Sequence, residues 1–420
     1  MTYFNYSNQI LHVESVALSK LAAEFSTPCY VYSRHAISQN WARYAEAFAA
    51  SQHPYKIFYA IKANSNIAIL NLLAKLGAGF DAVSGGEIDR VLAAGGAPQN
   101  IVFSGVGKTS AEISKAIDLG IHSINIESHA ELLRVQAIAQ QKNKQVEIAL
   151  RINPDIDANS HPYISTGSKE NKFGIDSKQA VEIFTLAASM ANIKLVGISC
   201  HIGSQITNLA PFMQAIDHLL AIIQMLTTKN IRLRFINIGG GLGVTYQDET
   251  PPSADQYVQA IVAKLKNLDL EIHIEPGRSI IADTGVLLTK VEYIKTTGEN
   301  KFAIIDAAMN DLMRPCLYNS YHEIVPVIQP AITANPEKYT IVGPICESSD
   351  FLAKDRYLTL QAGDLLAIKN TGAYGFSMSS NYNTRPRCAE ILVDQQQAYV
   401  IRQRETIEQL LQNEQLIDAR

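Results

Sequence analysis

Residues 56–126 read KIFYAIKANSNIAILNLLAKLGAGFDAVSGGEIDRVLAAGGAPQNIVFSGVGKTSAEISKAIDLGIHSINI, and this stretch decides the fold. Short runs of β-favouring residues recur in it every ~20 residues, with an amphipathic helical pattern between successive runs. Strand, helix, strand is the order typical of a parallel sheet with crossover helices. The predicted strands are Lys56–Ala60, Gly79–Val83, Asn100–Phe103 and Ser123–Ile126, and the predicted helices are Ile67–Leu76, Glu87–Ala94 and Ser110–Asp118.

The same alternation continues downstream of this stretch. It brings the count of strand–helix units to about eight, which favours a closed (β/α)8 barrel over an open doubly wound sheet. The predicted fold class is therefore α/β. The further strands are Val146–Ile152, Leu195–Cys200, Phe235–Ile238 and Glu271–Ile274, and the further helices are His129–Gln140, Lys178–Met190 and Phe212–Thr227.

After about residue 285 the pattern changes. Val286–Ile294 and Tyr357–Leu360 are strand-like with partial alternation, Tyr399–Ile401 is a short β-favouring run, and a helix with a capping box is predicted at Thr406–Gln412. The N-terminal residues are strand-like too, and chain termini often lie close together. We therefore predict a barrel over residues 31–285 and a C-terminal antiparallel β domain, over residues 286–420, that also takes in residues 1–30.

Composition excludes several classes of protein. The 420 residues are 47% hydrophobic and 18% charged, with a net charge of −4, so the chain can bury a core and has no basic excess for nucleic acid or anionic lipid. No apolar run reaches the ~18 residues of a membrane-spanning helix, and the N-terminus lacks the pattern of a signal peptide. Five widely spaced cysteines without a CxxC pair predict neither disulfides nor a metal site. We expect a cytoplasmic protein.

Chemistry in such a barrel lies where strands end. Lys62 follows the first strand among apolar neighbours, and His201 follows the sixth. The seventh strand runs into Gly239-Gly240-Gly241, whose backbone can approach a phosphate closely. The eighth is followed by Glu275-Pro276-Gly277-Arg278. Each feature has a structural alternative: a surface lysine, a satisfied histidine, a tight turn, or an acid and an arginine that bind each other. Together, an amine, a ring, a phosphate cradle and an acid suit pyridoxal phosphate.

The motifs identify the chain as similar to the diaminopimelate decarboxylases, a family of alanine-racemase-like (fold type III) pyridoxal-phosphate enzymes. The Lys and EPGR motifs are shared with related decarboxylases, whereas the long loop after residue 153 and the SNYN-RPR segment are more particular to this family. The motifs are YAIKANSN at 59–66, FDAVSGGE at 80–87, NPDIDANSHPYISTGSKENKFGI at 153–175, CHIGSQI at 200–206, GGGLGV at 239–244, EPGRSI at 275–280, MRPCLY at 313–318, CESSD at 346–350 and GAYGFSMSSNYNTRPR at 372–387.

The resemblance implies a role for each cofactor-binding residue. Lys62 forms the internal aldimine with pyridoxal 5'-phosphate, supported by Asp81, and His201 stacks on the ring. Glu275 pairs with the pyridine nitrogen and keeps it protonated, which makes the ring a strong electron sink. The phosphate is held by Ser204, by the backbone of Gly239, Gly240 and Gly241, and by Gly277, Arg278 and Tyr374.

The implied reaction is the decarboxylation of meso-2,6-diaminopimelate to L-lysine and CO2, the last step of lysine biosynthesis. Arginine suits the distal carboxylate of this substrate, because it binds carboxylates through two hydrogen bonds. The resemblance assigns that role to Arg278 and Arg314 with Tyr318, the distal ammonium to Glu347, and a contact with the substrate to Tyr374. Cys346 is the implied proton donor, and it enters the site with Glu347 from the second subunit of a homodimer.

Two expectations concern particular positions. The loop His161–Phe173 is expected to close over bound substrate and exclude water. Ser349 stands where the family usually has glycine, which would add strain of about 1 kcal/mol or more if that position needs a positive φ.

Three alternatives remain open. The chain is alternatively another decarboxylase of the same fold that acts on ornithine, arginine or carboxynorspermidine. A non-catalytic pyridoxal-phosphate carrier is a weaker alternative, because such carriers lack the second domain. The third alternative is a phosphate-binding barrel enzyme that uses no pyridoxal phosphate.

Overall fold

The computed structural model describes residues 3–156, 171–331 and 335–417. The chain divides into two compact units. Ser38–Thr245 with Glu249–Ile280 form what we call the barrel unit. Met1–Ile37, Tyr246–Asp248 and Ile281–Arg420 form the β unit. No helix in the described part of the chain is long and apolar enough to cross a membrane.

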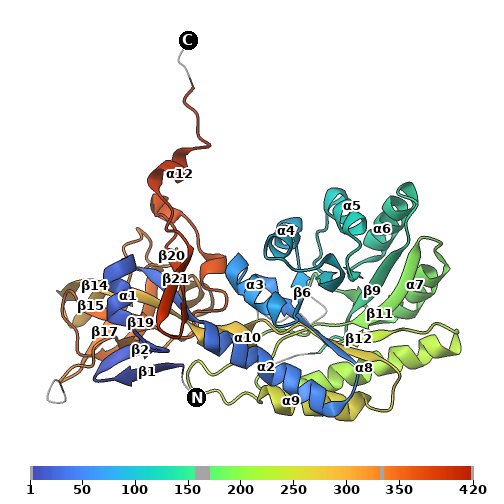
Figure 1. The fold of residues 1–420 in the computed structure, drawn as a ribbon, viewed down its shortest axis with the longest axis horizontal. Coiled ribbons are helices and arrows are strands. Elements are labelled where there is room, and N and C mark those ends of the chain that lie inside the picture. Colours follow the sequence, from blue (N-terminus) through green and yellow to red (C-terminus); the bar gives the residue numbers. More distant parts are fainter. Residues whose placement is uncertain (1–2, 157–170, 332–334, 418–420) are drawn as a thin grey trace. The chain divides into compact units, whose positions relative to one another are not determined.

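The barrel unit contains a closed ring of eight parallel strands, as predicted (Figure 1). Each strand pairs with the next in the order of the chain. Closure comes from β13 pairing with β5, with Ile274 opposite Ile57. The strands are β5 (Tyr55–Ala60), β6 (Gly79–Ala82), β7 (Ile101–Phe103), β8 (Ser123–Ile126), β9 (Val146–Asn153), β11 (Ile193–Ser199), β12 (Phe235–Asn237) and β13 (Glu271–Ile274), and the two-residue β10 (Ile175–Asp176) adds to β9.

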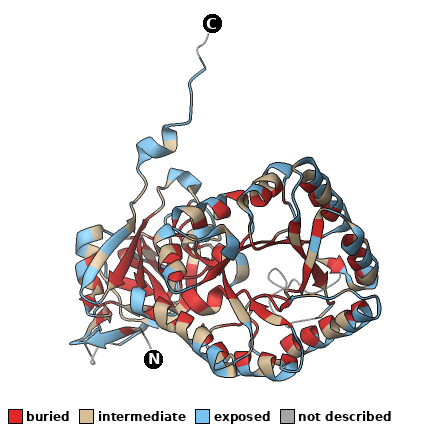
Figure 2. Cartoon of the chain, turned by 45° about the vertical axis from the view of Figure 1, so that its right-hand side comes forward, coloured by how far each residue is buried: buried red, intermediate tan, exposed pale blue. Residues whose placement is uncertain are grey.

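Helices surround the ring and turn their buried faces toward it (Figure 2). All six predicted helices are present, whereas α2 and α9 were not predicted. Side chains define where these helices begin: on α5, Thr109 and Glu112 form a capping box, and Gly120 ends the helix at a φ of 64°. The helices are α2 (Arg34–Ser51), α3 (Ile67–Lys75), α4 (Gly85–Ala93), α5 (Ser110–Leu119), α6 (His129–Gln141), α7 (Ser177–Ser189), α8 (Ala210–Thr228) and α9 (Ala254–Leu265).

Aromatic rings fill the barrel near the amino ends of its strands. Phe235 stacks on His273 at 4.0 Å between ring centroids, and Phe58 and His122 lie within 6 Å of them. Glycine makes room for Phe235: a Cβ at Gly197, which pairs with Phe235 across β11 and β12, would lie 2.2 Å from the phenyl ring. The barrel core thus depends on the absence of a side chain at Gly197.

The β unit is built around a sheet in the order β18-β17-β15-β14-β4-β20-β21. Its N-terminal strand β4 lies between β14 and β20, which confirms that the N-terminal residues join the C-terminal domain. Its strands are β4 (Cys29–Ser33), β14 (Gly285–Thr297), β15 (Asn300–Ile305), β16 (Ile324–Pro326), β17 (Glu337–Val342), β18 (Phe351–Leu358), β19 (Leu365–Ile368), β20 (Ala389–Asp394) and β21 (Gln397–Arg402), and β19 joins β16 to β14.

The β domain was predicted to be antiparallel, and two pairs of its strands are parallel instead. β4 runs parallel to β20, and β15 runs parallel to β17. Antiparallel neighbours require only a hairpin, whereas parallel neighbours require a long crossover. The chain between β15 and β17 is such a crossover and contains the short helix α11 (Arg314–Tyr318). The sheet is therefore mixed.

Smaller elements complete the β unit. A three-stranded sheet precedes α1 (Leu18–Phe25), whose Leu18 and Leu21 pack in one buried cluster with residues of β4, β14 and β20. Near the C-terminus, α12 (Ile407–Leu411) begins at a capping box between Thr406 and Gln409, as predicted. The three strands are β1 (Phe4–Ser7), β2 (Ile10–Val13) and β3 (Val16–Ala17).

We expect Gly197→Ala to destabilise the protein by about 1–3 kcal/mol, because the new methyl group would force the Phe235 ring out of the packed core. Urea denaturation followed by far-UV circular dichroism measures the loss. Gly107→Ala is the matched control, because a Cβ there would meet nothing within 4 Å. Equal midpoints for the two variants would contradict the role given to Gly197.

Candidate active site

Lys62 lies at the carboxyl end of β5, in a short 3-10 turn (η1, Ile61–Ala63). Its Nζ is 2.8 Å from Oδ2 of Asp81 on β6. The Asp81 side chain is fully buried, and burial alone would raise its pKa, but the Lys62 ammonium keeps the pKa of Asp81 below the ordinary value. Asp81 therefore fixes the position of the Lys62 amine, which remains about one-third exposed.

Glu275 follows β13 and is buried. Oε1 of Glu275 accepts a hydrogen bond from the Asn237 side chain at 2.6 Å. Burial, with the nearby negative charge of Asp81, raises the pKa of Glu275 to about 8. The carboxyl group therefore carries a proton at neutral pH in the protein as it stands, although Lys62 and Asn237 favour its ionised form.

The three glycines after β12 form a turn that admits no side chains. A Cβ at Gly239 would lie 2.5 Å from the carbonyl oxygen of Cys200, and one at Gly240 would lie 2.2 Å from that of Glu275. Gly239 and Gly241 also have φ values of +72° and +119°, which disfavour other residues. The turn thus packs directly against the backbone at the ends of β11 and β13.

His201 follows β11, and its Nδ1 accepts a hydrogen bond from the backbone N–H of Gly240 at 3.2 Å. Burial lowers the pKa of His201 to about 3, assisted by the positive charges of Arg151 and Lys62. The ring is therefore uncharged at neutral pH. Arg151 itself is held by a buried ion pair, with Nη1 2.8 Å from Oε1 of Glu127.

Arg278 begins the short helix α10 (Arg278–Ile281) after Gly277. Its guanidinium donates to Oγ of Ser204 through Nε at 3.3 Å and Nη2 at 3.0 Å. Gly277 packs against Ala60, where an added Cβ would come within 3.0 Å of the alanine methyl group. Every residue predicted in the barrel unit therefore lies where strands β5, β6, β11, β12 and β13 end.

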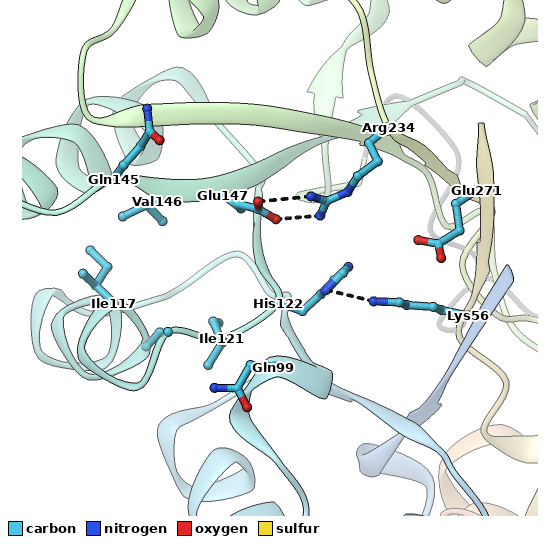
Figure 3. A pocket seen from close by; sticks show the side chains of 12 residues that line it. Lys56, Gln99, Ile117, Ile121, His122, Gln145, Val146, Glu147, Arg234 and Glu271 are labelled. Atoms are coloured by element: carbon cyan, nitrogen blue, oxygen red, sulfur yellow. Dashed lines mark hydrogen bonds and ion pairs between the residues drawn. The ribbon is translucent and has the colours of Figure 1, made fainter. Parts of the chain in front are cut away.

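A cavity of about 610 Å³ opens at the other end of the barrel, where strands begin (Figure 3). Arg234 binds both carboxylate oxygens of Glu147 there, at 3.1 and 2.6 Å, and Nζ of Lys56 is 3.4 Å from Nδ1 of His122. None of the predicted site residues lines this cavity. Because chemistry in these barrels lies at the carboxyl ends, we assign the active site to the end that holds Lys62.

The residues predicted to select the substrate lie in the β unit. Arg314 is the first residue of α11 and is buried, and its guanidinium lies 4.5 Å above the ring of Tyr246. Tyr318, the last residue of the same short helix, is half-buried. α11 thus carries both residues one helical turn apart.

Cys346 and Glu347 are exposed in the loop between β17 and β18. The side chain of Asn383 accepts a hydrogen bond from the backbone N–H of Cys346 at 2.8 Å, and the Tyr382 hydroxyl donates to Glu347 at 3.4 Å. Ser349 does not have a positive φ, so the backbone strain expected for a serine at this position does not arise.

Two segments of the β unit within the motif at 372–387 contain residues with left-handed backbone. Tyr374 has a φ of 55°, and Asn383 and Thr384 have φ values of 55° and 57°. A β-branched or aromatic residue rarely adopts this conformation, which costs of order 1 kcal/mol or more. The surrounding structure therefore holds both segments in place at the expense of local strain.

Sequence reasoning missed Asn237 and Asn383. Asn237 both donates to Glu275 and accepts a hydrogen bond from the Gly239 N–H at 2.8 Å, so it joins the glycine turn to the buried acid. Its position two residues before the glycine run was the available signal. Asn383 lay inside a quoted motif, but nothing in the sequence linked it to Cys346.

Residues 157–170, which hold most of the predicted loop His161–Phe173, lie outside the described residues.

Residues 34–282 match a family described as the pyridoxal binding domain of pyridoxal-dependent decarboxylases. The chain is 51% identical to the diaminopimelate decarboxylase of Pseudomonas aeruginosa, over 99% of this chain and 100% of that protein. The crystal structure of diaminopimelate decarboxylase from Helicobacter pylori, complexed with L-lysine, is 45% identical and superposes with a TM-score of 0.90, covering 94% of this chain and 98% of that one.

The diaminopimelate decarboxylase structure from M. jannaschii gives a TM-score of 0.94 at 37% identity, covering 99% of this chain and 98% of the other. These matches extend through both the barrel unit and the β unit. Identity of this level over nearly the whole length, together with the match to the pyridoxal binding domain, leaves one family. The chain belongs to the diaminopimelate decarboxylases, a family of pyridoxal-dependent decarboxylases.

Proposed function

We propose that the protein catalyses the decarboxylation of meso-2,6-diaminopimelate to L-lysine and CO2 with pyridoxal 5'-phosphate as cofactor, the reaction for which its relatives are named. The observation that supports this most strongly is the gathering of Lys62, Glu275 and an uncharged His201 around a side-chain-free glycine turn. An amine, an acid, a ring and a backbone cradle are the groups that this cofactor requires.

The residues present fit the cofactor. Lys62 would bind its aldehyde covalently, because the amine is held by Asp81 yet remains accessible. His201 would stack on the ring, for which an uncharged imidazole is suited. The turn at Gly239–Gly241 would receive the phosphate, because a glycine backbone can approach a phosphate closely. Further phosphate contacts are proposed for Ser204, Gly277, Arg278 and Tyr374.

Glu275 would face the pyridine nitrogen. Bound pyridoxal phosphate supplies an electron sink for the pair of electrons left at the α-carbon when CO2 departs, and protonation of its ring nitrogen strengthens that sink. Because the pKa of Glu275 is raised to about 8, its carboxyl group holds a proton at neutral pH that it can transfer to a ring nitrogen. Asn237 holds Oε1 of Glu275 in place.

Substrate selection would depend on the second amino-acid head group. Arg278 and Arg314, with Tyr318, would bind the distal carboxylate, and Glu347 would bind the distal ammonium. Ornithine and other diamine precursors have no distal carboxylate, so a buried arginine such as Arg314 would serve no purpose for them. This supports diaminopimelate over the substrates of the related decarboxylases.

Cys346 would return a proton to the α-carbon after CO2 has left. In the single chain the Cys346 side chain and its neighbour Glu347 are exposed, which suits residues that complete a site in a second copy. We therefore propose a homodimer with shared active sites. A free catalytic thiol also requires reducing conditions, so we place the enzyme in the cytoplasm.

Lys62→Ala is expected to abolish turnover and the cofactor absorbance band that borohydride reduction removes, because the only proposed point of covalent attachment is lost. CO2 release from diaminopimelate and the visible spectrum measure both. Lys56→Ala is the matched control: Lys56 lies near the amino end of β5, the strand that Lys62 follows, and this variant should keep the absorbance band and turnover. Retained activity in Lys62→Ala would overturn the assignment.

The wild-type protein separates the alternative functions. Release of CO2 from ornithine or arginine instead of diaminopimelate would favour the related decarboxylases. A cofactor absorbance band without turnover would indicate a carrier.

Glu275→Gln is expected to stabilise the cofactor-free protein at pH 8, with a benefit that shrinks toward pH 5. The folded-state pKa of Glu275 is raised to about 8 from an ordinary value of 4.5, so between these values only the unfolded chain gives up this proton. Wild-type stability therefore falls as pH rises through that window. Urea denaturation at several pH values measures it. Exposed Glu182→Gln should match wild type throughout, and a pH-independent benefit at residue 275 would refute the raised pKa.

Shared sites can be tested by mixing two impaired variants. Cys346→Ala should slow product formation while keeping the cofactor band, and Lys62→Ala should have neither. If each site takes Lys62 from one subunit and Cys346 from the other, a reassorted one-to-one mixture recovers about a quarter of wild-type activity, since half the dimers are mixed and each has one intact site. Activity no higher than that of the separate variants would mean that each subunit builds its own site.

A further inference from the structure

We infer that His322 and Tyr246 are positioning residues for Arg314, and that through it they set the selectivity of the enzyme for a distal carboxylate. The inference rests on the proposed function, in which Arg314 binds that carboxylate. It concerns Arg314, His322 and Tyr246, three side chains of the β unit that no sequence motif connects. His322 follows α11, and Tyr246 belongs to the segment Tyr246–Asp248.

The hydrogen bonds of His322 fix which of its nitrogens carries the proton. Nε2 lies 2.9 Å from Nη1 of Arg314, and Nδ1 lies 2.8 Å from the carbonyl oxygen of Lys369. A guanidinium can only donate and a carbonyl can only accept. His322 must therefore accept at Nε2 and donate at Nδ1, so it is neutral.

The backbone holds the His322 ring rigidly. The ring is completely buried. The N–H of Lys369 donates to the carbonyl of Glu323 at 2.8 Å, next to the pairing of β16 with β19. Arg356 donates to the carbonyl of His322 itself at 3.3 Å. The nitrogen that faces Arg314 thus has a position set by the sheet.

Tyr246 holds Arg314 from a second direction. Its ring meets His322 edge-on at 5.3 Å with an interplanar angle of 75°, and the Arg314 guanidinium lies 4.5 Å above the Tyr246 face. Neither an aromatic face nor a neutral imidazole cancels a positive charge. These two contacts orient the buried guanidinium.

Two substitutions separate the hydrogen bonds of His322. Glutamine places its amide oxygen near the position of Nε2, so His322→Gln keeps an acceptor for Arg314. Asparagine reaches only the position of Nδ1, so His322→Asn keeps the contact with Lys369 and loses that with Arg314. We expect His322→Asn to raise the KM for diaminopimelate about tenfold with little change in kcat, and His322→Gln to stay close to wild type.

Two competitive inhibitors give a reading that general damage would not produce. L-lysine, the proposed product, retains the distal carboxylate, whereas 1,5-diaminopentane has none. We expect His322→Asn to raise the inhibition constant of L-lysine about tenfold and to leave that of 1,5-diaminopentane unchanged. Cofactor absorbance should match wild type. Tyr246→Leu, which removes the aromatic face, should raise the inhibition constant of L-lysine and leave that of 1,5-diaminopentane unchanged. This variant replaces His322→Asn as the test if His322→Asn does not fold.

The inference is wrong if His322→Gln and His322→Asn behave alike, if both inhibitors shift together, or if Tyr246→Leu shifts neither. Failure of the proposed function looks different: wild-type enzyme would then not turn over diaminopimelate, whatever residue occupies position 322.

Discussion

The pairing of β13 with β5 is the constraint on which the rest of the site depends. These strands are more than two hundred residues apart in sequence, and their parallel pairing closes the barrel. The closure continues past the strands, because the N–H of Ala60 donates to the carbonyl of Pro276 at 3.1 Å and Gly277 packs against Ala60. As a result the segment that carries Glu275 and Arg278 begins beside the turn that carries Lys62.

Closure also explains the electrostatics. Lys62, Asp81 and Glu275 are brought together at one buried edge, where each charge alters the ionisation of the others. The Lys62 ammonium keeps Asp81 ionised, and that negative charge adds to burial in keeping Glu275 protonated. Two carboxyl groups near one amine thus differ in protonation, and the amine is in direct contact with Asp81.

The sequence predicted the barrel strands well because each is a short β-favouring run followed by an amphipathic helix. Ser123–Ile126 and Glu271–Ile274 begin and end where predicted. Prediction failed where a partner is remote in sequence. The parallel neighbours of β4 and β15 come after long connections, so local patterns gave no indication of their direction. The helix α9 was missed although Ser253 and Gln256 form a capping box at its start.

The candidate site shows the same difference between local sequence patterns and contacts that are remote in sequence. Residues at strand ends were identified by position, since strand ends are where such barrels place their chemistry. The asparagines that contact Glu275 and Cys346 were not. Asn237 reaches a carboxyl group 38 residues away, and Asn383 reaches Cys346 across 37 residues. Contacts of this kind require the coordinates.

The central place of β4 in its sheet has a consequence for synthesis on the ribosome. β4 ends at Ser33, but its neighbour β20 begins only at Ala389. At about 5–20 residues per second, the ribosome needs about 20–70 s to make the chain between them. Both edges of this apolar strand are open until β14 is made from Gly285 onward, and the edge that β20 covers stays open until Ala389 follows. The nascent chain must therefore be shielded from pairing with its neighbours on a polysome, and a chain released before residue 389 keeps that edge permanently.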